Sequence, residues 1–340
     1  MADQKKKMPV WKRILWIVLA TIFIGVLGLF LFYQQKLNLI HYDSGAQSMD
    51  LDASYPLEEG AQQEGLPDGT NQIQLPEGEI FSDSQVFNLL LLGTDERTSE
   101  FSTNARADSM MVLSVHKGNH TLKLVSIERG IGVPIPGRND DLITHAFRYG
   151  GADLCLQIVR DCFQLDVNRY VRVNFHFFEQ IVNAVGGVNI VLTQREADAL
   201  NGKITTNAVT KNPVQAGENH LDGYDALQYS RLRYIDSDWK RIERQRKVIQ
   251  AIAQKLSDAS LMELNDLADQ VLPLVQTNLT KGEITSLLLE SPGFMGKPIE
   301  DMTIPTADTC WNMTGVDGRK MIGVDFQKNA QILREFFYES

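Results

Sequence analysis

The sequence is poor in cysteine, histidine and net positive charge. Three cysteines and six histidines occur among 340 residues, and their spacing matches no zinc-binding pattern. Acidic residues outnumber basic ones by 43 to 33, which gives a net charge of -10. A domain of this charge repels a phosphate backbone, and no basic stretch with interleaved aromatic residues offsets the repulsion. The composition therefore gives no indication of zinc and argues against a nucleic-acid partner.

The three cysteines leave two alternatives open. Cys155 and Cys162 are seven residues apart on a predicted helix, which separates them by about 10 Å, too far for a disulfide. One of them could pair with Cys310 in an oxidising exterior. Otherwise all three are buried free thiols.

One long apolar run is present near the N-terminus. Ile14–Tyr33 contains twenty residues without a charge, enough for a helix to cross the hydrocarbon core of a bilayer. The run is longer than the core of a signal peptide and lacks a small-x-small cleavage site. Residues 1–13 carry five basic side chains and one acidic one, so this tip is expected in the cytoplasm. We predict a single-pass membrane protein whose remaining residues lie outside the cell.

Beyond the predicted anchor, the composition separates a linker from a folded domain. Residues 34–80 are rich in Gly, Gln, Asp, Glu and Pro, which predicts a flexible stalk with part of it held against the domain. Residues 81–340 alternate short apolar runs with helical patterns and contain no second linker. We therefore predict one α/β domain. The clearest expected elements are a buried strand from Phe87, a hairpin over 109–127, a buried strand at 188–192 and a long helix over 239–256.

Two short segments place charge where strands end or begin. Gly93–Arg97 directly follows the first buried strand, and ligands gather beyond the carboxyl ends of strands in open α/β sheets. Arg106 and Asp108 are two residues apart at the start of the next strand, so they face the same side. Asp95 and Asp108 could hold Mg²⁺ together with substrate phosphates, while Arg106 contacts phosphate oxygens. Ordinary turn chemistry and a structural ion pair are the alternatives.

A third segment is the most informative. Arg231 and Arg233 share a side if that stretch is extended, and on the following helix Arg241 and Gln245 lie within about 40° of each other. Arg244 points well away, and we predict a structural ion pair for it. Arginines from a strand and a helix supply the bidentate donors that recognise phosphate oxygens. The arrangement predicts a site for a polyanion.

These segments also carry a resemblance to the LytR-CpsA-Psr family. The motifs recur in the order found in that family, over about residues 87–256: GTDER (93–97), RAD (106–108), SIER (126–129), NAVGGVNI (183–190), LDGYDALQYSRLR (221–233) and DWKRIERQ (238–245). Such proteins resemble phosphotransferases that move glycopolymers, such as teichoic acids or capsule, from a polyprenyl-pyrophosphate carrier to peptidoglycan. The resemblance implies an α/β/α sandwich with a mixed central sheet and a hydrophobic cavity for the lipid.

The resemblance also implies roles for single residues. Asp95 and Asp108 match the positions that bind Mg²⁺, for which Mn²⁺ is an alternative. The positions that contact pyrophosphate are matched by Arg106, Arg129, Arg231, Arg233, Arg241 and Gln245. The catalytic set implied is Asp95, Arg106, Asp108 and Arg129. Asp95 is the candidate general base if no metal occupies it.

Two departures from the family pattern bear on turnover. The usual Ser-Ile-Pro-Arg-Asp is Ser-Ile-Glu-Arg-Gly here, so Gly130 replaces an aspartate. A lysine and an asparagine further on become Leu142 and Thr144, although His145 is kept. We expect these changes to weaken catalysis more than binding. A non-catalytic protein that binds polyprenyl pyrophosphate, and a hydrolase of such lipids, are therefore the alternatives to a transferase.

Overall fold

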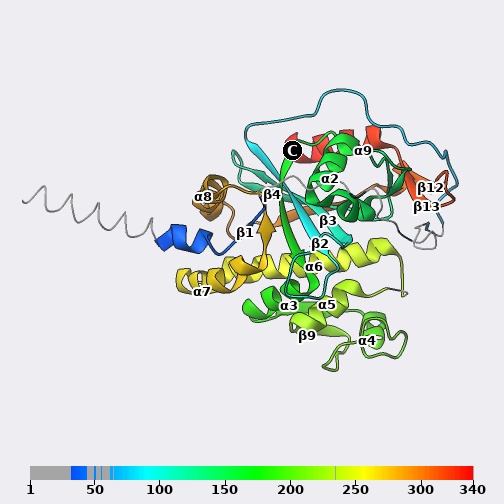
Figure 1. Cartoon of the computed structure of the whole chain (residues 1–340). Coiled ribbons are helices and arrows are strands. Elements are labelled where there is room, and N and C mark those ends of the chain that lie inside the picture. Colours follow the sequence, from blue (N-terminus) through cyan, green and yellow to red (C-terminus); the bar gives the residue numbers. More distant parts are fainter. Residues whose placement is uncertain are drawn as a thin grey trace, which may run out of the picture.

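A mixed β-sheet forms the centre of the protein (Figure 1). The computed structural model describes residues 32–43, 50, 55, 62–63, 65–233 and 235–339. Seven strands lie side by side in the order β1 (His41–Tyr42), β10 (Gln276–Thr277), β7 (Val167–Asn174), β2 (Val86–Thr94), β3 (Ala107–His116), β4 (Thr121–Ile127) and β11 (Ile299–Ile304). The pairs β1–β10, β7–β2 and β4–β11 are parallel, and the other neighbours are antiparallel. The predicted mixed sheet and its β3–β4 hairpin are confirmed.

Helices cover both faces of this sheet. They are α2 (Ala146–Phe163), α3 (Phe175–Ala184), α4 (Gln194–Leu200), α5 (Gly223–Arg231), α6 (Asp238–Asp258), α7 (Leu261–Val271), α8 (Lys281–Glu290) and α9 (Phe326–Tyr338). Short 3₁₀ turns are η2 (Ile143–His145), η3 (Leu272–Leu274), η4 (Ser291–Gly293) and η5 (Ala307–Thr309). Figure 1 shows α2 and α9 on one side of the sheet and α3, α5, α6 and α7 on the other. The molecule is therefore layered α/β/α.

Three small strand pairs lie outside the central sheet. They are β5 (Gly132–Val133) with β6 (Asp141–Leu142), β8 (Val188–Leu192) with β9 (Gly217–Leu221), and β12 (Cys310–Thr314) with β13 (Lys320–Val324). The prediction that residues 188–192 form a buried strand is wrong in one respect. Buried and exposed residues alternate along β8, and Val191 is 67% exposed. One face of β8 packs against residues of α5 and α6, and the other face meets solvent.

The main hydrophobic core lies between the sheet and the α2–α9 layer. Alternate residues of β2 and β3 point into it, among them Leu90, Leu92, Met110 and Val112, all nearly inaccessible to solvent. Burying one such side chain stabilises the fold by about 1.5–3 kcal/mol. This face is therefore rigid and fixes the ends of the strands in space.

The opposite face of the sheet is packed more openly. Leu89 and Met111 on this face are buried, but Leu91, Leu113 and Val171 beside them in the middle of the sheet are only half-buried. The helices on this side show the same feature, since α8 buries no residue and α7 buries none of the side chains that the structure describes. We call the half-buried apolar side chains of this sheet face and of α7 and α8 the open layer.

Part of the segment expected as a stalk lies against the domain. The two residues of β1 pair with β10 at the edge of the central sheet, and Asp68 forms a bridge to Asn312. Tyr55 stacks on His145 with ring centroids 3.8 Å apart. The sheet thus includes residues that the sequence had assigned to the linker of 34–80.

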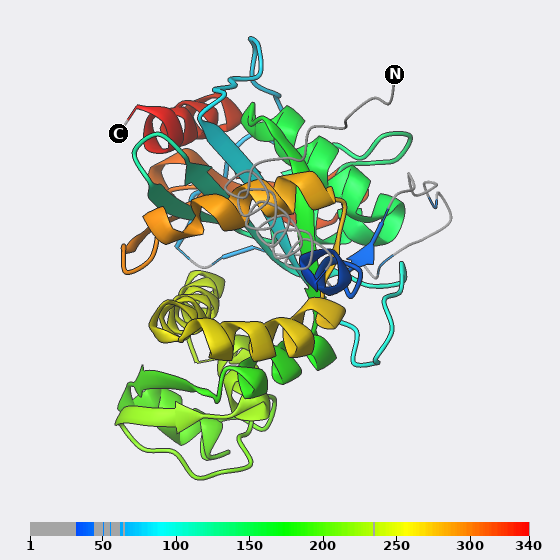
Figure 2. The same ribbon diagram turned by 90° about the vertical axis from the view of Figure 1, so that its left-hand side faces the viewer.

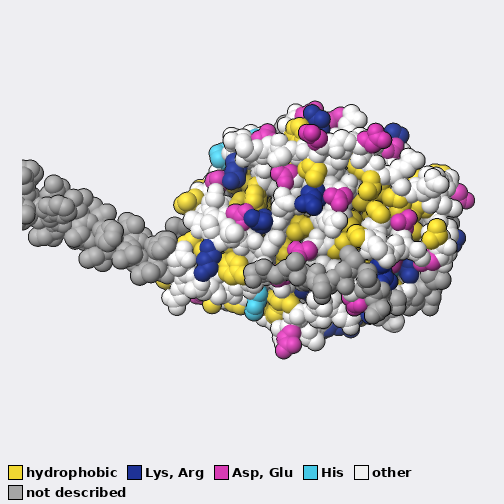
Figure 3. All heavy atoms as spheres, turned by 45° about the horizontal axis from the view of Figure 1, so that its top comes forward, with side chains coloured by type: hydrophobic (Ala, Val, Ile, Leu, Met, Phe, Trp, Pro, Cys, Tyr) yellow, Lys and Arg dark blue, Asp and Glu magenta, His cyan; other side chains and the backbone are white. Residues whose placement is uncertain are grey.

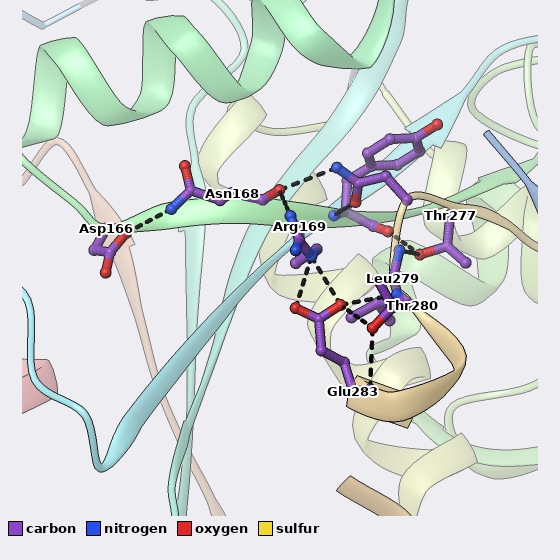
Figure 4. Close-up of polar contacts among 9 residues, drawn as sticks. Asp166, Asn168, Arg169, Thr277, Leu279, Thr280 and Glu283 are labelled. Atoms are coloured by element: carbon purple, nitrogen blue, oxygen red, sulfur yellow. Dashed lines mark hydrogen bonds and ion pairs between the residues drawn. The ribbon is translucent and has the colours of Figure 1, made fainter. Parts of the chain in front are cut away.

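The edge of the sheet near β10 is fastened to α8 by a closed polar network (Figure 4). Nε of Arg169 donates to both carboxylate oxygens of Glu283, at 2.8 and 2.9 Å. The same carboxylate accepts from the backbone N–H of Thr280 at 2.8 Å, which completes the capping box of α8. Through Arg169, the capping box ties the first turn of α8 to β7.

Two further expectations concern the anchor and the cysteines. The predicted span Ile14–Tyr33 lies outside the described residues except for its last two, and among the helices that are described none is long and apolar enough to cross a membrane. Cys155, Cys162 and Cys310 are all buried free thiols, so the disulfide alternative does not hold.

Candidate functional site

The charged segments singled out in the sequence converge at one edge of the central sheet. Because β2 and β4 run in the same direction, their carboxyl ends lie together, and antiparallel β3 begins there. Asp95 follows β2, Arg129 follows β4 by one residue, and Asp108 is the second residue of β3. The first turn of α6 adds Arg241 to the same place. The sheet edge and α6 thus assemble the site from four separate segments.

A continuous chain of ion pairs forms the centre of the site. Nη1 of Arg129 donates to Oδ1 of Asp108 at 3.0 Å, and its Nε donates to Oδ2 of Asp238 at 2.9 Å. The same Oδ2 accepts from Nη2 of Arg241 at 2.9 Å. Asp238 therefore orients two guanidinium groups at once. The sequence gave no sign of this bridge, because Arg129 and Asp238 are far apart in the chain.

A second pair lies beside this chain. Oδ2 of Asp95 accepts from Nε of Arg106 at 3.1 Å, and its Oδ1 accepts from the backbone N–H of Arg106 at 2.9 Å. Both side chains are partly exposed, at 23% and 31%. The charge of Arg106 also acts on Asp108, where it helps to lower the pKa. The structure thus brings together Asp95, Arg106 and Asp108, as the sequence predicted.

Arg231 is close to the site, but the predicted extended stretch is wrong. Arg231 is the last residue of α5, and the backbone leaves the helix only at Leu232. The side chain of Asp222 caps this helix by accepting from the N–H of Asp225. The guanidinium of Arg231 lies over the ring of Phe175, 5.0 Å from its centroid. Its pKa is lowered by burial and by the neighbouring charge of Arg97.

The two remaining predicted contacts lie further out. Arg233 is exposed, and its charge helps to lower the pKa of Asp238. Gln245 is half-buried on α6, one turn beyond Arg241 and on the same side of the helix. Both border the ion-pair chain.

Cations dominate the electrostatics of the site. Burial alone would raise the pKa of Asp108, but the charges of Arg129, Arg241 and Arg106 outweigh it and hold the pKa below its ordinary value. The pKa of Asp238 is lowered in the same way by Arg241 and Arg129. Five arginines meet three aspartates here: Arg106, Arg129, Arg231, Arg233 and Arg241 with Asp95, Asp108 and Asp238. The cluster keeps positive charge for an added anion, whereas acids and bases are interspersed on the α2–α9 face (Figure 3).

Glu128 is a residue of the site that the sequence did not single out. Its side chain is fully buried, Oε1 accepts from the N–H of Gly130 at 3.1 Å, and Oε2 has no hydrogen-bond partner among the described residues. Burial and the nearby charge of Asp238 raise its pKa to about 8, although Arg241 and Arg129 act in the opposite direction. The sequence did contain a signal for this residue, because an acidic side chain stands directly before Arg129 where the family has proline.

The positions that depart from the family pattern serve packing. Leu142 is buried against Met313 and Met321. The hydroxyl of Thr144 donates to the carbonyl of Ala107 at 3.0 Å, directly before Asp108. These residues support the site from beneath and do not add charge to it.

The arginine set aside in the sequence is separate from this cluster. Nε of Arg244 pairs with Glu196 at 2.9 Å, and its other nitrogens donate to the carbonyl of Leu232 and to Asp236. All these partners lie within the lobe formed by α4, α5 and α6. The predicted structural ion pair is confirmed.

The residues proposed for Mg²⁺ fit a hard cation. Both Asp95 and Asp108 offer carboxylate oxygens, and each directly follows one member of the pair Thr94 and Ala107, where β2 ends and β3 begins. Two carboxylates completed by phosphate oxygens and water are a usual environment for Mg²⁺. Among the described residues, no group of three or more His, Cys, Asp or Glu side chains is arranged to hold a metal. A metal held here would therefore depend on the substrate for its remaining ligands.

The fold and the charged cluster define an α/β protein with an arginine-rich anion site at the carboxyl ends of its strands. Residues 51–336 match the model of the LytR_cpsA_psr family, and the chain belongs to this family. The resemblance stated from the motifs is thereby confirmed.

Relatives of this chain include named transferases. The polyisoprenyl-teichoic acid–peptidoglycan teichoic acid transferase TagU of Oceanobacillus iheyensis is 31% identical over 299 residues, which cover 85% of this chain and 83% of TagU. TagT of Bacillus subtilis, named for the same activity, is 34% identical over 197 residues, 57% of this chain and 60% of TagT. The solved structure of TagT bound to LI-WTA has a TM-score of 0.61 at 24% identity and covers 88% of this chain and 98% of that one. This last similarity supports the fold.

Proposed function

We propose that this protein is a Mg²⁺-dependent phosphotransferase that moves a glycopolymer from a polyprenyl-pyrophosphate carrier to peptidoglycan. The observation that carries the proposal is the chain of Arg129, Asp238 and Arg241, which holds two guanidinium groups in fixed positions beside further arginines. Membership of the family and the names of relatives such as TagU point to the same activity. A teichoic acid or a capsule polymer is the expected cargo.

The site suits a pyrophosphate because its positive charge is arranged before the ligand arrives. Guanidinium groups donate paired hydrogen bonds to phosphate oxygens. Asp238 orients Arg129 and Arg241 through one shared oxygen, so neither side chain must be ordered by the ligand. Arg231, half-buried over Phe175, adds a third cation from a different helix.

The transfer requires a hydroxyl of the peptidoglycan acceptor to attack the phosphorus that bears the sugar. A new P–O bond forms, the bond to the second phosphate breaks, and polyprenyl phosphate leaves while the proton of the hydroxyl passes to the departing phosphate. Negative charge grows on the leaving phosphate, and fixed cations stabilise such charge. Arg129 and Arg241 are placed for this role. A Mg²⁺ ion held by Asp95 and Asp108 would neutralise the phosphate oxygens.

The open layer supports the proposed lipid carrier. A polyprenyl chain needs a long apolar surface, and the half-buried side chains of the second sheet face and of α7 and α8 offer one. Covering them with a hydrocarbon chain removes apolar area from water, at about 25 cal/mol per Å². The predicted anchor Ile14–Tyr33 would hold the domain on the outer side of the cell membrane, where the carrier lies.

A second candidate is a protein that binds the carrier without turnover. Gly130 favours it, because the aspartate that the family carries at this position is missing. The arginines of the site are all retained, so the two candidates share the same binding step and differ only in the transfer.

Full-length protein in lipid nanodiscs, supplied with a lipid-linked glycan, Mg²⁺ and peptidoglycan oligomers, tests the proposal. Covalent glycan–peptidoglycan product supports transfer, bound carrier without product supports the second candidate, and released phosphates without conjugate indicate hydrolysis. Arg231→Ala and Arg241→Ala are expected to weaken carrier binding, whereas Arg246→Ala, on the same helix but paired with Asp301, serves as the control. The site assignment is wrong if both site variants bind the carrier as tightly as the unchanged protein.

A further inference from the structure

Large apolar side chains are exposed together at one end of the molecule. Met262, at the start of α7, and Leu289, at the end of α8, are each 77% exposed. Leu256, Leu288 and Met295 near them are exposed as well. The end of α6 meets the turn after α8, because the N–H of Gly296 donates to the hydroxyl of Ser257 at 2.9 Å. We call Leu256, Met262, Leu288, Leu289 and Met295 the apolar end.

This end lies on the side of the molecule from which the predicted anchor departs. The predicted span finishes at Tyr33, and Lys36, three residues later, forms an ion pair with Asp269 on α7. Lys281 at the start of α8 donates to Asn38. Figure 2 shows α7 and α8 both crossing the face on which residues 32–37 lie. The junction with the anchor is therefore fixed to the same two helices that carry the apolar end.

The distances along these helices keep the apolar end close to the bilayer. Asp269 and Met262 are seven residues apart on α7, which is about 10 Å at 1.5 Å per residue. The headgroup region of a bilayer is about 5–7 Å thick on each side. The last turn of α7 contacts the junction with the anchor through Asp269, so its first turn, which carries Met262, lies within about 10 Å of that contact along the helix axis.

The lysines around the apolar end are paired within the protein. Lys297 donates to the carbonyl of Asn119 at 3.3 Å, and Lys117 lies 3.5 Å from the carboxylate of Glu290. Both lysines are engaged within the protein, and Glu290 stands directly beside Leu289, so the exposed apolar side chains carry the proposed contact rather than a positive surface. Exposed apolar surface of this kind marks an interaction site on a protein.

We propose that the apolar end rests in the headgroup region of the membrane that holds the anchor. This contact would place the open layer beside the bilayer, so that the carrier lipid enters it without crossing water. The lipid pathway rests on the proposed function, whereas the membrane contact itself does not.

Depth measurement on the full-length protein tests the contact. The native cysteines are buried, so a fluorophore can be attached selectively to Met262→Cys, Leu289→Cys or, as control, Val316→Cys. Val316 is 86% exposed and lies in the β12–β13 turn, at the opposite end of the molecule from residues 32–37 (Figure 1). In vesicles of phosphatidylglycerol and phosphatidylethanolamine with a lipid-bound quencher, the first two labels are expected to be quenched severalfold more than the third. Equal quenching at the three positions would overturn the proposal.

A second variant links the contact to the carrier lipid. Leu289→Asp places a charge at the interface and is expected to slow transfer from a vesicle-borne carrier about tenfold. Transfer from a water-soluble, short-chain carrier should be unchanged. Equal slowing with both carriers, or none with either, would overturn the proposed lipid pathway. Absence of transfer from both carriers by the unchanged protein would refute the proposed function and leave the quenching result to decide on the membrane contact.

Discussion

Two groups of arginines near α6 differ in how their charges are matched. Arg244 has Glu196 and Asp236 to itself, and a backbone carbonyl takes a further hydrogen bond. Arg129 and Arg241 instead share Asp238, with Asp108 as the only other carboxylate paired to either of them in the described structure. The first group is closed within the protein, whereas the second keeps donors and charge for a ligand. Position on one helix thus says less about function than the ratio of acids to bases around each arginine.

The comparison predicts that Arg244 acts on stability. Arg244→Met leaves Glu196 buried without its partner, which is expected to cost about 3–5 kcal/mol of unfolding free energy. Burial alone would lower the pKa of Arg244, but Asp236 and Glu196 outweigh this effect and raise the pKa above its ordinary value. A melting temperature lowered by about 10 °C, with unchanged affinity for the lipid pyrophosphate in the protein that remains folded, is the expected result. Weakened binding without a loss of stability would contradict the distinction between the two groups.

The site arginines should show the reverse. Arg129→Ala removes a donor that faces the growing charge and is expected to lower the transfer rate by about 10²–10³-fold. Arg246→Ala is the matched control, since Arg246 pairs with Asp301 outside the site. Rate measurements with saturating carrier separate this loss from weaker binding. Similar rates for the two variants would remove Arg129 from the transfer step.

The difference between Arg244 and the site arginines could be predicted from the sequence where it depends on local geometry. The 100° step of a helix was enough to direct Arg244 away from Arg241, and the strand ends were enough to bring Asp95 and Asp108 together. Other features depend on tertiary contacts between distant segments. The bridge from Asp238 to Arg129 joins residues far apart in the chain, and the close contact of Tyr55 with His145 involves a segment whose composition resembles a linker.

Glu128 is the buried acid of the site, and it differs from both groups of arginines because its side chain is held in the uncharged form. Its pKa is raised from 4.5 to about 8, so the folded protein binds this proton more tightly than the unfolded chain does. The contribution is fully favourable below about pH 4.5, and the free energy of unfolding decreases as the pH rises toward 8. Glu128→Gln should abolish this decrease and raise the melting temperature at pH 8 by about 5 °C. If the free energy of unfolding depends on pH in the same way in the unchanged protein and in Glu128→Gln, Glu128 ionises at its ordinary pKa.

The smallest expected effect tests the border of the site. Arg233 is exposed, and its charge acts on Asp238, so its attraction for a pyrophosphate is screened by salt. Arg233→Ala should weaken carrier binding about threefold at low ionic strength and leave it unchanged near 0.5 M salt. Lys240→Ala is the matched control, because Lys240 is exposed on the first turn of α6 and paired with Glu243. A loss of binding that persists at high salt would place Arg233 in direct contact with the ligand. Arg233 would then belong with Arg129 and Arg241 rather than with the residues that border the site.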